Sequence, residues 1–250
     1  MRRFVAVLAA ITTIALAAAG CGGSPNDPQP TGTQDGYPVT VGDVTLDSQP
    51  QRIVSLSPTL TEMLFAIDAG PQVVAVDEYS TYPEEAPRTD LSGYTPNAEA
   101  VVTYNPDLVV LDTDTNGIVA ALRELDIPVY VGPAASTVDD TYRQIAELGT
   151  LTGHPAEAQA LVTRMKDDLA KLLADLPERE EPLTYFYELD NTYYTVTSDS
   201  FIGSLFTAAG LVNIADEGNA DNPYPQLSEE RILAADPDLI FLADGYPGGE

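Results

Sequence analysis

The chain has 250 residues, of which 44% are hydrophobic and 20% charged, a composition typical of a folded globular protein. Acidic residues outnumber basic ones by 39 to 11, and a formal net charge of −28 repels phosphates, so we expect no nucleic-acid partner. A single cysteine excludes an internal disulfide. A single histidine, His154, excludes a histidine-rich metal site and makes any Ser-His-Asp mechanism depend on that residue.

Residues 1–20 have the pattern of an export signal, because two arginines precede an apolar run over residues 4–19 that ends in small residues. Cys21 follows the sequence Leu-Ala-Ala-Ala-Gly, which resembles the lipobox of bacterial lipoproteins and implies a lipidated Cys21. The alternative is an ordinary secretory signal with an incidental cysteine. Residues 21–38 are rich in Gly, Pro and polar residues, which predicts a flexible tether. We therefore expect an exported protein that is lipid-anchored to the outer face of the cell membrane, or one that lies in the periplasm.

The periodicity of apolar residues in the rest of the chain predicts alternating strands and helices. A hairpin is expected over residues 39–46, around Gly42 and Asp43. The expected strands cover residues 52–56, 73–76, 108–111, 129–131, 184–188, 193–197 and 239–242. The expected helices cover residues 59–69, 97–104, 117–125, 139–151, 201–209 and 228–234. This alternation predicts an α/β fold with a mostly parallel sheet.

The longest helical pattern lies in the middle of the chain, over residues 154–177. Pro155 suits the first helical position and Pro177 ends the pattern. Leucine and methionine recur along it at spacings of three and four residues, which predicts one apolar face. His154 lies beside Pro155, so we expect it to cap the helix or lie on the surface rather than act as a catalytic base.

An internal repeat indicates two related halves. Residues 97–111 and 228–242 both contain a capping residue, a glutamate two positions later, a short helix, the sequence Pro-Asp-Leu and an apolar strand. The two prolines, the two aspartates and the two glutamates are each 131 residues apart. Because the long helical pattern falls between these segments, it is the natural connector of two lobes.

The repeat therefore sets the predicted domain boundaries. We expect an N-terminal lobe over residues 39–153, a connecting helix over 154–177 and a C-terminal lobe over 178–250. By symmetry with the first lobe, about 40 residues are missing after the last strand, so we expect the second lobe to be incomplete.

Several segments resemble the periplasmic-binding-protein family that serves ABC importers of iron-siderophores, haem and cobalamin. They include RIVSLSP at 52–58, VAVDEYSTYP at 74–83, GLVNI at 210–214 and PQLSEE at 225–230, besides the two Pro-Asp-Leu segments. The match follows the family's order and is closest to the cobalamin-type members around 79–83 and 224–230. The resemblance implies two Rossmann-like lobes joined by one long helix, a chelatase-like, helical-backbone architecture with a ligand between the lobes.

The expected ligand site lies beyond the carboxyl ends of the strands, where open α/β sheets bind ligands. The resemblance implies that Tyr79, Tyr94 and Tyr224 present aromatic rings, and a tyrosine offers an apolar face and a hydroxyl to a large conjugated chelate. The alternative is tyrosines that fill the interface between the lobes. The predicted ligand-binding residues are Ser57, Tyr79, Tyr94, Asp112, Tyr224 and Tyr246.

Two glutamates have a separate predicted role. Glu99 and Glu230 each follow a capping residue by two positions, where the helix macrodipole favours a carboxylate. The resemblance implies instead that these glutamates, one in each lobe, dock onto arginines of a permease. Charge pairs of this kind would set the orientation of the complex more than its affinity.

The resemblance thus implies a monomeric extracytoplasmic lipoprotein that binds a ferric siderophore, haem or cobalamin and delivers it to an ABC permease with its ATPase. We expect no cofactor, no catalytic residue and no metal held by protein side chains. A chelatase-like or hydrolytic enzyme is the first alternative, and it requires His154 inside the cleft as a base. A surface lipoprotein without a transport role is the second.

Overall fold

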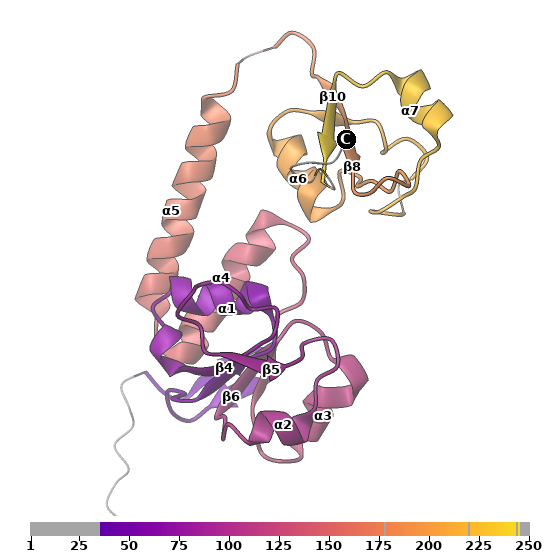
Figure 1. Ribbon diagram of the computed structural model, residues 1–250. Helices are drawn as coiled ribbons and strands as arrows, with labels where there is room; N and C mark the ends of the chain where they lie inside the picture. Colours follow the sequence, from indigo (N-terminus) through magenta and orange to yellow (C-terminus); the bar gives the residue numbers. More distant parts are fainter. Residues whose placement is uncertain (1–35, 178, 220, 244, 246–250) are drawn as a thin grey trace, which may run out of the picture. The chain divides into compact units, whose positions relative to one another are not determined.

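The computed structural model describes residues 36–177, 179–219, 221–243 and 245 (Figure 1). The export signal at 1–20, Cys21, the tether up to residue 35 and Tyr246 lie outside the described residues, so their predicted roles stay predictions. Within the described ranges, no helix has the length and apolar character needed to cross a membrane.

A hairpin and a five-stranded sheet form the first part of the described chain. Strands β1 (Val39–Val41) and β2 (Val44–Leu46) pair antiparallel around Gly42 and Asp43, as predicted. The sheet is parallel throughout and has the order β5-β4-β3-β6-β7. Its strands are β3 (Ile53–Ser55), β4 (Val73–Asp77), β5 (Arg88–Leu91), β6 (Leu108–Leu111) and β7 (Val129–Val131).

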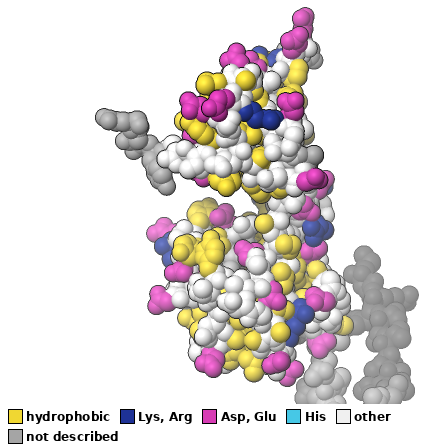
Figure 2. Space-filling view, turned by 90° about the vertical axis from the view of Figure 1, so that its right-hand side faces the viewer, with side chains coloured by type: hydrophobic (Ala, Val, Ile, Leu, Met, Phe, Trp, Pro, Cys, Tyr) yellow, Lys and Arg dark blue, Asp and Glu magenta, His cyan; other side chains and the backbone are white. Residues whose placement is uncertain are grey.

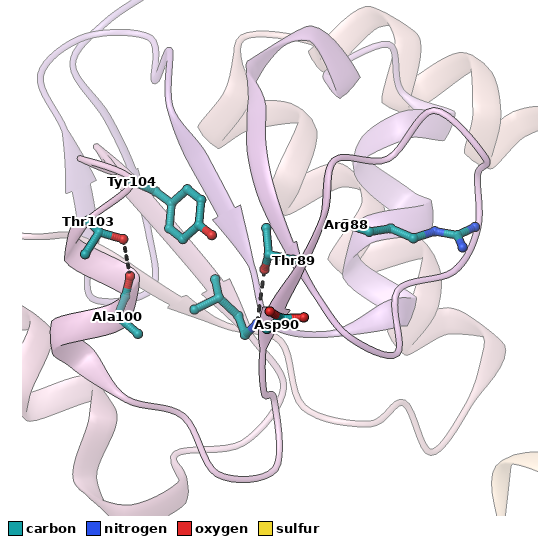
Figure 3. A pocket seen from close by; sticks show the side chains of 7 residues that line it. Arg88, Thr89, Asp90, Ala100, Thr103 and Tyr104 are labelled. Atoms are coloured by element: carbon teal, nitrogen blue, oxygen red, sulfur yellow. Dashed lines mark hydrogen bonds between the residues drawn. The ribbon is translucent and has the colours of Figure 1, made fainter.

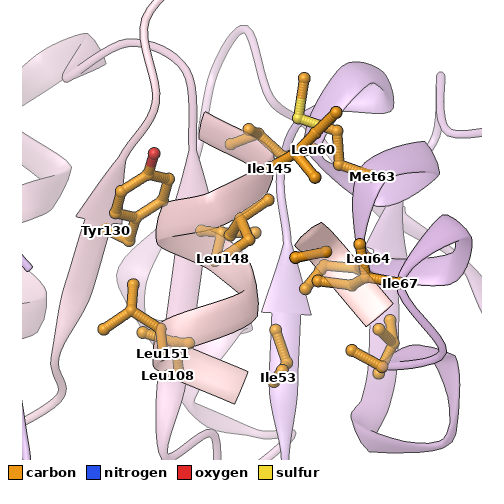
Figure 4. Packing of buried hydrophobic residues seen from close by; sticks show 14 of the residues in the cluster. Ile53, Leu60, Met63, Leu64, Ile67, Leu108, Tyr130, Ile145, Leu148 and Leu151 are labelled. Atoms are coloured by element: carbon orange, nitrogen blue, oxygen red, sulfur yellow. The ribbon is translucent and has the colours of Figure 1, made fainter. Parts of the chain in front are cut away.

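Helices cover both faces of this sheet, because successive strand residues point to opposite sides. Ile53 packs in one cluster with residues of α1 (Pro58–Ala66) and α4 (Val138–Thr152) (Figure 4). Val54 packs in the other cluster with α2 (Ala98–Val102) and α3 (Ile118–Arg123). Short 3₁₀ turns, η1 (Gly70–Gln72) and η2 (Thr115–Gly117), precede β4 and α3.

The predicted long helix is α5 (Pro155–Ala174), about 30 Å long at 1.5 Å per residue. Its first turns pack on α4, where a Cβ atom added at Gly149 would lie 2.4 Å from the Cβ of Ala158. Ala158 and Val162 are buried at this contact. The absence of a side chain at Gly149 therefore allows the two helices to approach closely.

The second sheet repeats the centre of the first with the same parallel topology. Its strands β8 (Thr184–Glu188), β9 (Val212–Asn213) and β10 (Leu239–Leu242) have the order β10-β8-β9, which matches β6-β3-β4. On one side Phe206 of α6 (Phe201–Ala208) lies 4.7 Å from Tyr185 and 4.6 Å from Phe241, between ring centroids. On the other side Ile232 of α7 (Glu229–Ala235) packs with Phe186.

The repeated Pro-Asp-Leu segments occupy matching positions in the two sheets. Asp107 accepts hydrogen bonds from the backbone N–H groups of Gln51 and Arg52 at 2.7 and 2.8 Å, just before β3. Asp238 likewise accepts from the N–H of Thr184 at 2.8 Å, at the start of β8. In both halves, this carboxylate therefore holds the amino end of the neighbouring parallel strand.

The backbone of the repeat matches as well. Asn105 and Asp236, which precede the two prolines, have φ values of 48° and 46°. Asn and Asp are the side chains that best tolerate this left-handed conformation. The two halves therefore share a turn, a carboxylate contact and a strand order, as the repeat predicts.

One predicted strand, at 193–197, is wrong. The segment makes an isolated bridge between Tyr194 and Gln226, and Tyr193 has a φ of 64°. Its partner contains Pro223 and Pro225, which accept hydrogen bonds through their carbonyl oxygens but have no N–H to donate, so a regular ladder cannot form.

Two strands were not predicted. β5 has the sequence Arg-Thr-Asp-Leu, in which only the last residue is apolar, and β9 has two residues. Both are edge strands, the outermost strands of their sheets, where the side chains need little burial.

The surface carries many more acids than bases, as the composition requires (Figure 2). Among the described residues, three arginines form ion pairs with carboxylates. Arg123 pairs with Asp43, Arg143 with Asp140 and Glu147, and Arg231 with Glu217. These pairs further reduce the positive charge that the described surface offers to an anionic partner.

Candidate functional site

The carboxyl ends of three neighbouring strands bring predicted ligand residues to one edge of the first sheet. The N–H of Leu56 donates to the carbonyl oxygen of Val110 at 2.9 Å, which holds the ends of β3 and β6 together. Ser57 follows β3, Tyr79 follows β4 and Asp112 follows β6. The parallel topology therefore places these three residues at the same edge, as expected.

Tyr79 and Tyr94 form an aromatic pair at this edge. Their ring centroids are 5.3 Å apart and the ring planes are perpendicular, a favourable edge-to-face arrangement. Both rings remain open to solvent, with Tyr79 54% and Tyr94 74% exposed. Two exposed rings held against each other offer an apolar surface with two hydroxyl groups beside it, which suits a flat or conjugated ligand.

A buried carboxyl group lies at the end of β4, two residues before Tyr79. Asp77 is 2% exposed, and its side chain accepts a hydrogen bond from the Oγ of Ser80 at 2.5 Å. Burial raises the pKa of Asp77 above its usual range, and the negative charge of Asp112 raises it further. Hydrogen bonds from the Ser80 hydroxyl and from the N–H groups of Tyr79 and Ser80 act in the opposite direction on the pKa.

Hydroxyl groups continue from this carboxyl towards β3. The Oγ of Ser80 lies 2.9 Å from Oγ1 of Thr61, in α1, and Thr61 donates to the Oγ of Ser55 at 2.8 Å. Ser55 in turn donates to the carbonyl oxygen of Ser57 at 3.3 Å. This set (Asp77, Ser80, Thr61, Ser55 and the Ser57 carbonyl) is called the hydroxyl chain below.

Ser57 lies beneath the surface of the edge rather than on it. It is 1% exposed, and its Oγ is buried without a hydrogen-bond partner. Although Ser57 precedes the first residue of α1, its side chain does not cap the helix. Its predicted ligand contact would require the edge to open around this hydroxyl.

Gly93 allows the loop that carries Tyr94 to lie directly over the strand ends. A Cβ atom at this position would lie 2.6 Å from the carbonyl oxygen of Leu56 and 3.1 Å from Oδ2 of Asp77. The first of these distances is too short for any side chain, and the second is tight. The close approach, rather than an unusual φ angle, therefore requires glycine here.

The second lobe presents one predicted aromatic residue. Tyr224 is 49% exposed, and its N–H donates to Oδ1 of Asn222 at 3.0 Å in the loop before α7. Its ligand contact and that of Tyr246 stay predictions.

The two predicted docking glutamates have the same local setting. Glu99 and Glu230 are exposed in the first turns of α2 and α7. The side chain of Asn97 caps α2 and that of Ser228 caps α7, each by accepting from the N–H three residues later. Both roles considered for these residues, macrodipole stabilisation and docking, fit this setting.

His154 lies at the opposite edge of the first sheet. It stands at the N-cap position of α5, and its Nδ1 is 3.3 Å from Oγ1 of Thr152. The carbonyl oxygen of Thr152 accepts from the Nε2 of Gln72, which directly precedes β4. The only histidine is therefore near the amino end of the strand whose carboxyl end precedes Tyr79, and it cannot serve as a base beside that tyrosine.

A cavity of about 540 Å³ opens at the lateral edge of the sheet, between β5 and α2 (Figure 3). Arg88, Thr89, Asp90 and Leu91 line it from the strand, Ala100 from the helix, and Thr103 and Tyr104 from the turn that follows the helix. None of the predicted ligand residues lines it. The sequence did not indicate this cavity because β5 was not predicted.

No three His, Cys, Asp or Glu side chains in the described part of the chain form a group that could hold a metal ion.

Sequence reasoning missed the residues beneath the aromatic pair. Asp77, Ser80, Thr61 and Gly93 were not predicted to have roles, although an aspartate that ends an apolar strand and a serine three residues later are visible in the sequence. The contact of Gly93 with Leu56 could not be foreseen, because it joins loops 37 residues apart.

Comparison with known proteins matches a model of the family described as periplasmic binding protein to residues 53–248. A cobalamin-binding protein of Halobacterium salinarum is 38% identical over 216 residues, which cover 82% of this chain and 58% of the relative. An uncharacterized ABC transporter substrate-binding lipoprotein of Bacillus subtilis is 29% identical, over 98% of this chain and 82% of its own length. The crystal structure of the periplasmic vitamin B12-binding protein of Vibrio cholerae superimposes with a TM-score of 0.63 at 30% identity, covering 78% of this chain and 77% of that one.

Replacing Gly93 by alanine should destabilise the edge. The added Cβ must push the loop away from the Leu56 carbonyl, a backbone atom that cannot rotate aside, at a cost of about 1–3 kcal/mol. Thermal and urea unfolding measure this loss. Gly245→Ala is the matched control, since its Cβ would meet nothing closer than 3.8 Å. Equal stability of both variants would contradict the close approach at Gly93.

Proposed function

The chain belongs to the periplasmic binding protein family, and on that premise we propose that it captures a metal chelate for an ABC importer. The family and the relatives are binding proteins that serve transport, so the chain is a binding protein and not an enzyme. The chain spans 58% of the length of the Halobacterium relative, and its ligand and partners are therefore part of the proposal.

The proposed ligand is a corrinoid of the cobalamin type. The observation that supports it most directly is the exposed edge-to-face pair of Tyr79 and Tyr94 at the carboxyl edge of a parallel sheet. Such rings can pack against the rim of a macrocycle while their hydroxyls bond to its amide groups. Two similar proteins, from Halobacterium and Vibrio, are named for binding cobalamin or vitamin B12. Haem and ferric siderophores are the other chelates to be compared.

Transport would require a second surface, for which Glu99 and Glu230 are the proposed contacts. Each is an exposed carboxylate at the same position of a repeated helix. A permease with a cationic residue facing each glutamate would be held in one orientation. The ATPase of the importer would supply the energy for transport, and the binding protein would select the solute that is delivered to the permease.

We also propose that the protein is exported and attached to the membrane through a lipid on Cys21. The lipobox-like sequence before this cysteine supports the proposal, as does the lipoprotein name of the Bacillus relative, which matches over 98% of the chain. With a net charge of −28, the protein gains no electrostatic attraction to anionic lipids, so a covalent anchor suits its attachment.

Cyanocobalamin titrations of Tyr79 variants test the proposed ligand. We expect the wild type to bind, and Tyr79→Ala to weaken binding about tenfold or more, because a buried aromatic contact contributes about 1–2 kcal/mol. Tyr79→Phe should retain most of the affinity through its ring. Tyr82→Ala is the matched control, because Tyr82 is 67% exposed on the same loop. Haemin and a ferric siderophore are titrated in parallel. Tighter binding of either, or equal losses in the Tyr79 and Tyr82 variants, would contradict the cobalamin site.

Fractionation of a bacterial host tests the anchor. The wild type should incorporate labelled palmitate and sediment with membranes, whereas Cys21→Ser should lose the label and leave the membrane fraction. Ser24→Ala, three residues further on, should behave as the wild type. An unlabelled wild type would count against lipidation.

A further inference from the structure

The hydroxyl chain beneath the aromatic pair has one proton too few when Asp77 is ionised. Ser55, Thr61 and Ser80 supply one hydroxyl proton each. These protons are used by three hydrogen bonds, from Ser80 to Asp77, from Thr61 to Ser55 and from Ser55 to the Ser57 carbonyl. The 2.9 Å contact between the hydroxyls of Thr61 and Ser80 is then left without a proton.

A proton on the Asp77 carboxyl resolves this shortage. The carboxyl would then donate to the Oγ of Ser80, which would release the proton of Ser80 for Thr61. Every contact of the hydroxyl chain would then be a hydrogen bond with one proton, and each group would donate to the next one, from Asp77 to the Ser57 carbonyl. Because Asp77, Ser80, Thr61 and Ser55 are all at most 2% exposed, water cannot replace a missing hydrogen bond without rearrangement.

The surroundings of Asp77 also favour its neutral form. Burial raises its pKa, and the charged group that raises it further is Asp112, from the end of β6. Strand β5 pairs with β4 here and places Leu91 opposite Asp77, while its charged residues Arg88 and Asp90 are exposed. The remaining elements contribute neutral groups: Thr61 from α1, the backbone of Gly93 from the loop above, and Tyr79 with Ser80 from its own loop. Glu78, the adjacent acid, is exposed. The charged group that acts on Asp77 is thus a second acid, Asp112, which disfavours ionisation of the Asp77 carboxyl.

The same carboxyl connects the two loops that hold the aromatic pair. On one side it accepts from the hydroxyl of Ser80, in the loop that carries Tyr79, and on the other it lies under Gly93, which precedes Tyr94. A change in the charge of Asp77 would therefore alter the surroundings of both the Tyr79 and the Tyr94 rings. A ligand on these rings would exclude water from the loops above Asp77, which disfavours its charged form further.

We propose that Asp77 is a positioning residue that carries a proton when the site is occupied, so that it fixes the Tyr79–Tyr94 pair and ligand binding takes up one proton. The proposal rests on the proposed function for the identity of the site, and it adds a dependence on pH. By linkage, the affinity at this site rises as the pH falls through the titration of Asp77. If binding raises the pKa of Asp77 by one unit, the affinity changes about tenfold across that interval.

The first experiment needs no ligand. NMR follows the side-chain carboxyl carbon of Asp77 and the ring signals of Tyr79 and Tyr94 from pH 3 to pH 8 in the wild type. We expect the carboxyl to titrate above the usual aspartate range, and the two rings to shift with the same midpoint. Since the folded state holds this proton more tightly than the unfolded one, the free energy of unfolding should fall as the pH rises through the same interval.

Asp77→Asn separates this role from a structural one. Its amide can donate to Ser80 while its carbonyl oxygen accepts the loop N–H groups, so it mimics the protonated acid. The ring titration and the matching pH dependence of stability should disappear in this variant. Asp90→Asn is the control: it removes an exposed acid of β5 that lies outside the hydroxyl chain. This variant should retain the ring titration and the pH dependence of stability of the wild type. A carboxyl that titrates in or below the usual range, or rings that titrate equally in Asp77→Asn, would overturn the proposal.

The second experiment measures binding of cyanocobalamin from pH 4.5 to pH 8. The wild type should lose about tenfold in affinity over this range, and Asp77→Asn should bind at every pH with the affinity of the wild type at its acid limit. An identical pH profile in both proteins would overturn the proton uptake. Absence of cyanocobalamin binding at any pH would refute the proposed ligand instead, and the ligand-free titrations would still decide the state of Asp77.

Discussion

The buried carboxyl of Asp77 is the contact around which the candidate site is arranged. It ends β4 in a buried position, where its hydrogen bonds must come from the protein, chiefly from the hydroxyl of Ser80. Gly93 brings the second loop over the same carboxyl. The two tyrosines of the pair belong to these loops, so the loops that contact Asp77 also hold the perpendicular ring contact. A rigid pair loses little conformational freedom when a ligand binds, which favours affinity.

Duplication explains why the two parallel sheets of the described chain share one topology. In each half a carboxylate of the Pro-Asp-Leu segment holds the amino end of the central strand, and a left-handed residue precedes the proline. These contacts lie at the amino ends of the strands, opposite to the carboxyl ends that carry the candidate site. The repeat therefore maintains the fold at one edge of each sheet and leaves the loops at the other free to differ. Tyr94 and Tyr224 each lie in a loop before a repeated helix, but only the first lobe contains the described aromatic pair.

Much of the fold could be predicted from local patterns. Strands β6, β7, β8 and β10 were predicted at their observed bounds, since each is an apolar run between turn residues. Edge strand β5 was missed because its four residues are mostly polar, and the strand predicted at 193–197 fails because prolines stand opposite it. Local patterns do not include the partner of a strand, so they reveal neither that β4 pairs with the polar β5 nor that prolines stand opposite 193–197.

The site was predicted less completely, for a related reason. The positions of Ser57, Tyr79 and Asp112 follow from the ends of parallel strands, which the sequence indicates. The pairing of Tyr79 with Tyr94 and the burial of Ser57 depend on loops that meet only in the folded chain. Asp77 was overlooked because an acid at a strand end is usually solvated, and only the covering loop at Gly93 makes it a buried group.

Hydrogen–deuterium exchange with and without cyanocobalamin tests most directly where this protein binds its ligand. We expect slower exchange of the amides at 78–81 and 92–95, the two loops that carry the aromatic pair. Protection confined to 88–91 and 100–104, around the cavity between β5 and α2, would contradict this expectation, as would an exchange pattern that saturating cyanocobalamin leaves unchanged.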